Sequence, residues 1–163
     1  GQVRIAAKVP NREEFGEIVR HLAVQVKKAG AKVVLGTEVS DDDVLSARPD
    51  AVIVATGSTP LSSELPGADA SHVLNIWDVI QENAPVGQQV VVVDGGEASW
   101  QCYSTIEFLL GKGKQVSLIT RLNSIGVDIP THSLPTLHRR LFSKGLSVYL
   151  YTDEPVAQTP SYR

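Results

Sequence analysis

The stretch that decides the fold is Val90–Trp100, with the sequence VVVVDGGEASW. Four β-branched residues lead into a glycine pair and then a helix-forming stretch, which predicts a buried strand, a tight turn and a helix. Such a turn binds dinucleotides when it carries the pattern GxGxxG, because the glycines admit the pyrophosphate and the helix start donates amides. Here the glycine positions are filled by Asp94, Gly96 and Ser99, with Gly95 as an additional small residue. The pattern is therefore degenerate, and whether the turn binds a nucleotide becomes the central question.

Two acidic residues in this turn disfavour tight dinucleotide binding. Asp94 and Glu97 place negative charge where a pyrophosphate would lie, and a carboxylate beside helix amides can itself occupy the anion site. The next strand ends at Thr120 and Arg121, whereas NAD sites place an acidic residue there, about 20 residues on, to bind the ribose. This difference favours NADP over NAD, with Arg121 facing the additional phosphate. Two alternatives stay open: a solvated arginine, and a turn that binds nothing.

The segments on both sides of the turn alternate between strand and helix patterns. Apolar strands that alternate with helices are typical of a parallel sheet covered on both faces, so we expect an α/β fold of Rossmann-like, three-layer type. The loop 58–69 is rich in Ser, Pro and Gly and predicts a boundary between domains 1–68 and 69–163. The expected strands are 31–36, 50–57, 90–93, 115–120 and 146–152. The expected helices are one capped by Asn11 and ended by Gly30, a turn at 41–48, and 76–81, 98–110 and 135–144, with Cys102, Ile106, Leu109, Leu110, Leu137, Leu141 and Phe142 inward.

Composition restricts the class of protein. The 163 residues carry a formal net charge of −3 with scattered Lys and Arg, which argues against a nucleic acid partner. No stretch approaches the roughly 20 apolar residues of a membrane span, and no signal peptide pattern is present. A single cysteine excludes an internal disulfide and favours a cytoplasmic protein. The first residue is Gly and no Met is present, from which we expect a segment of a longer protein.

We expect neither catalytic residues nor a metal site within this segment. His132 and His138 lack a carboxylate or cysteine at a ligand spacing. Cys102 and Ser104 lie in an apolar helical stripe without an evident base, so an enzyme acting through Cys102 is disfavoured. Trp100 follows the glycine turn directly and is either a packing residue or a cover over the nucleotide pocket.

A second strand end carries small residues that suit a bound nucleotide. In VIVATGSTP (Val52–Pro60) the backbone at Ala55, Thr56 and Gly57 can pass close to a ligand. Together with GQVRIAAKVPNREEF, LPGAD, VVVVDGG and EFLLGKGKQVSLIT, in this order and spacing, it resembles the C-terminal half of the trimethylamine dehydrogenase and 2,4-dienoyl-CoA reductase family. The similarity is greatest to the branch of demethylases and amine dehydrogenases.

The resemblance implies a function for the parent protein. In that family a barrel resembling old yellow enzyme carries FMN and a 4Fe-4S cluster, and two nucleotide-binding folds follow; the first binds FAD or ADP, and the second binds NAD(P)H in the reductases. The chain is then the nucleotide-binding portion of a multidomain flavin-dependent oxidoreductase, with the chemistry on FMN elsewhere in the parent chain. The alternative is a degenerate fold that serves as a structural or dimerisation module or docks an electron-transfer protein. The implied cofactor-binding residues are Ala55, Thr56, Gly57, Asp94, Gly95, Gly96, Ser99 and Arg121.

Overall fold

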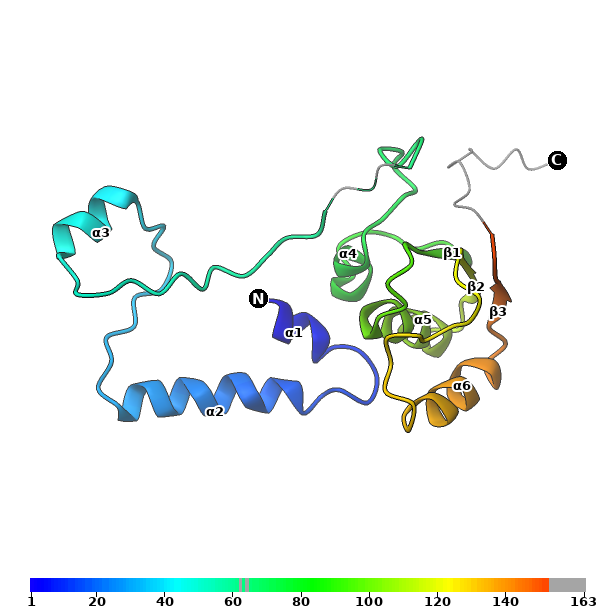
Figure 1. Cartoon of the computed structure of the whole chain (residues 1–163), viewed down its shortest axis with the longest axis horizontal. Coiled ribbons are helices and arrows are strands. Elements are labelled where there is room, and N and C mark those ends of the chain that lie inside the picture. The colour runs from blue at the N-terminus through cyan, green and yellow to red at the C-terminus, as the bar shows by residue number, and fades with distance from the viewer. Residues whose placement is uncertain (62, 64, 153–163) are drawn as a thin grey trace.

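The computed structural model describes residues 1–61, 63 and 65–152 and contains helices and a parallel sheet (Figure 1). The C-terminal half holds the sheet and its packed helices, whereas α2, α3 and long extended segments make up most of the N-terminal half. In chain order the elements are α1 (Gln2–Ala6), α2 (Phe15–Lys28), α3 (Asp41–Ala47), α4 (Ile76–Gln81), β1 (Gln89–Asp94), α5 (Trp100–Gly111), β2 (Gln115–Thr120), α6 (Leu134–Phe142) and β3 (Ser147–Tyr149).

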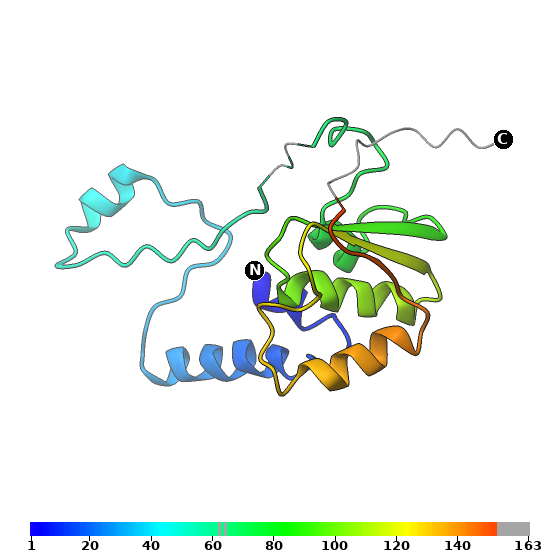
Figure 2. The same cartoon turned by 45° about the vertical axis from the view of Figure 1, so that its right-hand side comes forward.

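The sheet has three parallel strands in the order β1-β2-β3, so the predicted α/β class with a parallel sheet is confirmed. Helix α5 connects β1 to β2, and α6 connects β2 to β3 (Figure 2). Both connections advance in the same direction along the sheet, so right-handed crossovers bring both helices to the same face. Val91, on the opposite face of β1, is 56% exposed, and within the described residues the packed core lies on the helix side.

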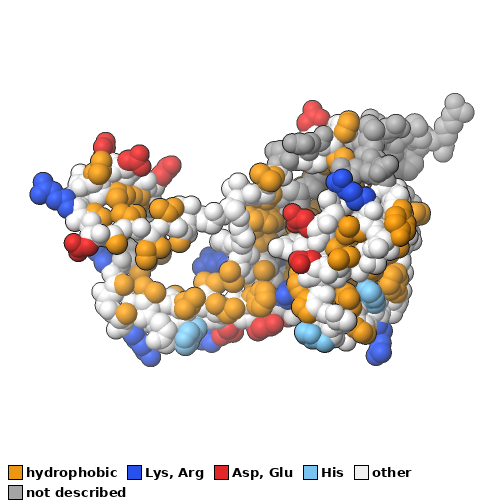
Figure 3. Space-filling model, viewed as in Figure 1, with side chains coloured by type: hydrophobic (Ala, Val, Ile, Leu, Met, Phe, Trp, Pro, Cys, Tyr) orange, Lys and Arg blue, Asp and Glu red, His pale blue; other side chains and the backbone are white. Residues whose placement is uncertain are grey.

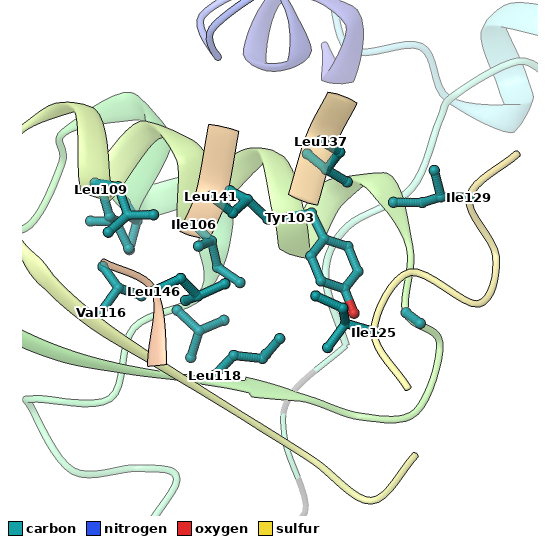
Figure 4. Close-up of a cluster of buried hydrophobic side chains, with 14 residues drawn as sticks. Tyr103, Ile106, Leu109, Val116, Leu118, Ile125, Ile129, Leu137, Leu141 and Leu146 are labelled. Atoms are coloured by element: carbon teal, nitrogen blue, oxygen red, sulfur yellow. The ribbon is translucent and has the colours of Figure 1, made fainter. Parts of the chain in front are cut away.

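The core joins α5, β2 and α6 through side chains that sequence periodicity identifies (Figure 4). Ile106 from α5, Leu118 from β2 and Leu141 from α6 have no exposed surface, and Tyr103 and Leu137 complete the centre. Burial of such a side chain contributes roughly 1.5–3 kcal/mol, so this cluster holds the helices against the sheet. The Tyr103 hydroxyl accepts a 2.8 Å hydrogen bond from the backbone N–H of Gly126, which links the loop after β2 to the core.

The prediction of strands at 31–36 and 50–57 is wrong for this structure. Both segments are extended but unpaired, and their side chains are exposed; Leu35 is 85% exposed and Ile53 is 91% exposed. Figure 3 shows hydrophobic side chains at the surface in this part of the molecule. A strand forms when its backbone pairs with a neighbour, and none of the described strands lies beside these segments.

The N-terminal helices differ from expectation in their ends. The predicted amphipathic helix is confirmed as α2, but Glu14 occupies its N-cap position without a side-chain bond. Asn11 does not cap it: its backbone φ is 63°, and its side chain bonds to α5 instead. Helix α1 was not expected from the sequence. The predicted turn at 41–48 is confirmed as α3, which is held by a capping box between Ser40 and Asp43.

In the C-terminal half the expected elements are present with small changes. Helix α4 and strand β2 have the predicted bounds, and β1, α5 and α6 differ by one or two residues at their ends. Phe142 is 49% exposed, so its predicted inward orientation is wrong; it ends α6 at the protein surface. Strand β3 covers only residues 147–149 of the predicted strand 146–152. None of the helices described has the length and apolar character that a membrane span requires.

Candidate functional site

The glycine turn lies at the carboxyl edge of the sheet. Strand β1 ends at Asp94, which pairs in register with Thr120 at the end of β2, and α5 begins after the turn at Trp100. In open parallel sheets, ligands bind at this edge, outside the carboxyl ends of the strands. The structure therefore brings together five of the eight cofactor-binding residues predicted from the sequence: Asp94, Gly95, Gly96, Ser99 and Arg121.

The side-chain carboxylate of Asp94 points towards the backbone amides of the glycine turn. Its Oδ1 accepts hydrogen bonds from the backbone N–H groups of Gly96 and Ala98, both at 3.1 Å. The hydroxyl of Thr120 donates to Oδ2 at 3.4 Å, and Asp94 is only 4% exposed. The negative charge expected from the sequence is thus directed at amides of the turn that precedes α5. A carboxylate in this place gives the turn an internal anion.

The backbone of the turn is in conformations that favour glycine. Gly96 has φ +99°, in the region that side chains rarely adopt, so glycine is required here by the backbone itself. Ala98 has φ 46° and is fully buried, an unusual conformation for a residue with a Cβ. Both residues donate to Asp94, so its hydrogen bonds support the strained turn.

Arg121 lies across the turn. Its Nη2 donates a 3.4 Å hydrogen bond to the carbonyl oxygen of Gly95, and a Cβ built on Gly96 would lie 3.7 Å from its Nε. Arg121 is therefore beside the glycine turn. Its predicted role there is to face the additional phosphate of NADP. Ser99 is the N-cap residue of α5, but its side chain makes no capping hydrogen bond.

Trp100 is covered by the N-terminal segment. The guanidinium of Arg12 lies over the Trp100 ring, 4.2 Å from the ring centroid. The same guanidinium is 5.5 Å from the centroid of the Phe15 ring. Trp100 therefore packs against Arg12 through the face of its ring.

The other three predicted cofactor-binding residues lie outside this site. Ala55, Thr56 and Gly57 lie on the unpaired extended segment, and Gly57 has φ +79°. The neighbouring Ser58 accepts a 3.3 Å hydrogen bond at its carbonyl oxygen from the side chain of Gln2. No hydrogen bond between described residues joins Ala55–Gly57 to the glycine turn.

Two residues that sequence reasoning missed are Glu107 and Arg140. Glu107 is 3% exposed, and its carboxylate accepts hydrogen bonds from Arg140 at 2.6 and 3.3 Å and from Asn11 at 3.2 Å. The available signal was a single acid within the apolar stripe of α5, since a buried carboxylate requires a partner. In the described part of the chain, no group of three or more His, Cys, Asp or Glu residues could hold a metal ion.

Burial keeps the thiol of Cys102 in its protonated form. Burial, and secondarily the charge of Asp94, raise the pKa of its thiol from 9.0 to about 12. The thiolate is the reactive form, and such a pKa lowers its fraction at pH 8 about a thousandfold.

We expect iodoacetamide to alkylate Cys102 at pH 8 at least about a hundredfold more slowly in the folded chain than in urea, as followed by mass spectrometry. The same pKa affects stability. The unfolded chain loses its thiol proton at lower pH than the folded chain, so this contribution to stability is complete below pH 9 and declines as pH rises towards 12. Equal alkylation rates in the folded chain and in urea would contradict the raised pKa of the Cys102 thiol.

Comparison with known proteins identifies the relatives of the chain. No family model matches the sequence. N,N-dimethylglycine/sarcosine dehydrogenase of Chromohalobacter salexigens is 27% identical over 150 residues, covering 88% of this chain and 22% of the relative. The probable N-methylproline demethylase of Rhizobium meliloti is 30% identical over 136 residues, covering 82% of this chain and 20% of the relative.

Solved structures agree with these relatives. The 2-naphthoyl-CoA reductase in complex with 2-naphthoyl-CoA has a TM-score of 0.82 and 25% identity, with 93% of this chain and 22% of that chain covered. Histamine dehydrogenase from Rhizobium sp. 4-9 shows the same fold, with a TM-score of 0.75 and 20% identity. The match covers 92% of this chain and 25% of the histamine dehydrogenase chain.

The homologues are demethylases, dehydrogenases and NADH oxidases of the old yellow enzyme and trimethylamine dehydrogenase family, and the resemblance based on the motifs is confirmed. These homologues are flavin-dependent oxidoreductases. The chain spans between about one fifth and one quarter of the length of the relatives described above.

Proposed function

We propose that this chain is the dinucleotide-fold portion of a multidomain flavin-dependent oxidoreductase, and that its glycine turn is occupied by its own carboxylate. The observation that carries the proposal is the position of Asp94, whose Oδ1 accepts hydrogen bonds from Gly96 and Ala98 at 3.1 Å. A pyrophosphate at this turn would compete for amides that are already bonded and would meet a buried negative charge. The turn thus has the shape of a nucleotide site but serves the packing of β1, β2 and α5.

In this proposal the chemistry of the parent protein takes place elsewhere. FMN and an iron–sulfur cluster are typical of the family, and flavin would supply hydride and electron transfer when bound. Asp94 holds the strand-to-helix connection, and Arg121 closes the turn at Gly95. The division into an FAD- or ADP-type fold (1–68) and an NADP-type fold (69–163) is part of the proposal, as is docking of an electron-transfer protein or a second subunit.

A second candidate function is binding of NADP(H) at the same turn. It is favoured by Arg121, whose guanidinium lies 3.4 Å from the Gly95 carbonyl oxygen, next to the glycine turn. An arginine in this place could bind the additional phosphate that distinguishes NADPH from NADH. The two candidates differ in one measurable property, which is the affinity of the unmodified chain for NADPH.

Calorimetric titration of the 163-residue chain with NADPH, NADH and ADP at low salt tests the proposal. We expect no binding in the micromolar range for any of the three. The double variant Asp94→Gly/Ser99→Gly frees the turn amides and restores the GxGxxG pattern, and is expected to gain at least about tenfold in affinity for one of these nucleotides, a difference of about 1.4 kcal/mol.

Asp94→Asn is the matched control. An asparagine Oδ1 can accept from the same two amides and its Nδ2 can donate to Thr120, so the turn stays occupied after the charge is removed. We expect it to bind nucleotides more weakly than the double variant. Micromolar binding of NADPH by the wild-type chain would replace the proposal with the second candidate. A double variant that is folded by circular dichroism, yet silent with all three nucleotides, would show that Asp94 is not the obstacle.

A further inference from the structure

A polar pocket lies away from the turn amides, where three parts of the chain meet. The N-terminal loop contributes Asn11 and Arg12, helix α5 contributes Trp100, Ser104 and Glu107, and the start of α6 contributes further lining. The pocket has a volume of about 320 Å³. A small polar molecule fits a pocket of this size.

One wall of the pocket is a single face of α5. Trp100, Ser104 and Glu107 are spaced four and three residues apart, so their side chains project from the same side of the helix. Ser104 is only 7% exposed, and its hydroxyl makes no hydrogen bond within the described residues. The neighbouring Thr105, in contrast, donates to the Gln101 carbonyl at 2.7 Å. Within the described residues the only fully buried polar side-chain atom without a partner is His138 Nε2, so the Ser104 hydroxyl retains accessible surface. Because Ser104 lines the pocket, this hydroxyl is available for a molecule there.

The charges around the pocket leave one arginine without a counterion. The Glu107 carboxylate is engaged by Arg140 on both oxygens and by the Asn11 amide. Arg12 contacts the face of Trp100, and in the described chain its guanidinium makes no hydrogen bond or ion pair. With two arginines and one glutamate, these groups carry one net positive charge. Guanidinium N–H groups and a serine hydroxyl are the donors that bind oxyanions in proteins.

We propose that this pocket binds the phosphate or carboxylate group of a small molecule. Arg12 supplies the charge and N–H donors, and Ser104 donates its hydroxyl from the α5 wall of the pocket. The Glu107–Arg140 pair and the Asn11 amide hold the N-terminal loop against α5, so that Arg12 stays in place. The site is independent of the glycine turn, because Asp94, Gly96 and Ala98 do not line it. The proposal therefore stands whether or not the turn binds a nucleotide.

The test uses inorganic phosphate and acetate as probes, titrated separately into the 163-residue chain. Binding is followed by calorimetry and by tryptophan fluorescence, since Trp100 forms part of the wall. We expect saturable binding of at least one probe in the millimolar range. Arg12→Gln removes the charge and is expected to weaken that binding about tenfold, and Ser104→Ala removes one donor and is expected to weaken it about threefold.

Arg20→Gln is the matched control for Arg12→Gln. Arg20 is an exposed arginine on α2 that pairs with Glu17 and does not line the pocket, so its loss is expected to leave probe affinity unchanged. Asp94→Asn serves the same purpose for the glycine turn. Binding of phosphate alone or of acetate alone identifies the oxyanion class. The absence of saturable binding of either probe overturns the proposal. Unchanged affinity in Ser104→Ala also overturns it. This variant is expected to fold, because it removes only one oxygen atom.

Discussion

Replacing Ile106 with alanine is expected to lower the free energy of unfolding by about 3–4 kcal/mol. Ile106 has no exposed surface and lies at the centre of the cluster that joins α5, β2 and α6 (Figure 4). Its removal loses the transfer free energy of the buried atoms and leaves a cavity between well-packed neighbours, which relax only in part. Urea unfolding of the variant and of the wild-type chain, followed by far-ultraviolet circular dichroism, measures the difference.

Ile18→Ala is the matched control for this substitution. Ile18 lies on α2 and is 49% exposed, and alanine is the better helix former. The same chemical change is expected to alter stability by less than about 1 kcal/mol at this position. If the two variants lost equal stability, the cluster around Ile106 would not be the core of the chain.

Replacing Glu107 with alanine is expected to cost about 2–3 kcal/mol of unfolding free energy. The carboxylate holds two partners from distant parts of the chain, Arg140 on α6 and Asn11 in the N-terminal loop. Its loss leaves the guanidinium of Arg140 without a partner. Because that side chain is 33% exposed, water compensates in part, and the effect stays below that of a fully buried pair.

Hydrogen exchange distinguishes this loss from general destabilisation. In Glu107→Ala the amides of α1 and α2 are expected to exchange faster relative to those of β2, because Asn11 no longer holds the N-terminal loop to α5. Glu107→Gln keeps one acceptor oxygen and is expected to show a smaller effect. Glu17→Ala removes an exposed partner of Arg20 and is expected to change nothing measurable. A Glu107→Ala variant indistinguishable from Glu17→Ala would contradict the role given to this carboxylate.

Most elements of the C-terminal half followed from sequence because their signals are local. The continuous β-branched run before Asp94 predicts β1, the apolar spacing through Ile106 predicts α5, and QVSLIT predicts β2 with its observed bounds. The glycine positions of the turn and the likelihood that a carboxylate would occupy it were also evident. These features depend on residues close together in the chain and on pairing between strands that the chain itself contains.

The partners of individual side chains followed only from tertiary structure. The sequence placed Asp94 at a glycine position, but the two amides that it binds depend on the fold of the turn. Glu107 meets Arg140 from 33 residues away and Asn11 from 96 residues away, and no local pattern specifies either contact. The sequence predicts that Asn11 caps α2. In the structure its side chain bonds to the distant, buried carboxylate of Glu107 instead of to the helix start.

By itself, the sequence determined the α/β class, the glycine turn and the resemblance to the family of the relatives. The spacing of apolar residues, the turn residues and the order of the motifs are all carried by residues close together in the chain. The tertiary structure decided that 31–36 and 50–57 are unpaired, that the amides at Gly96 and Ala98 are bonded to Asp94, and that Arg12 lies on Trp100. Strand pairing, burial and charge compensation are properties of groups brought together in space.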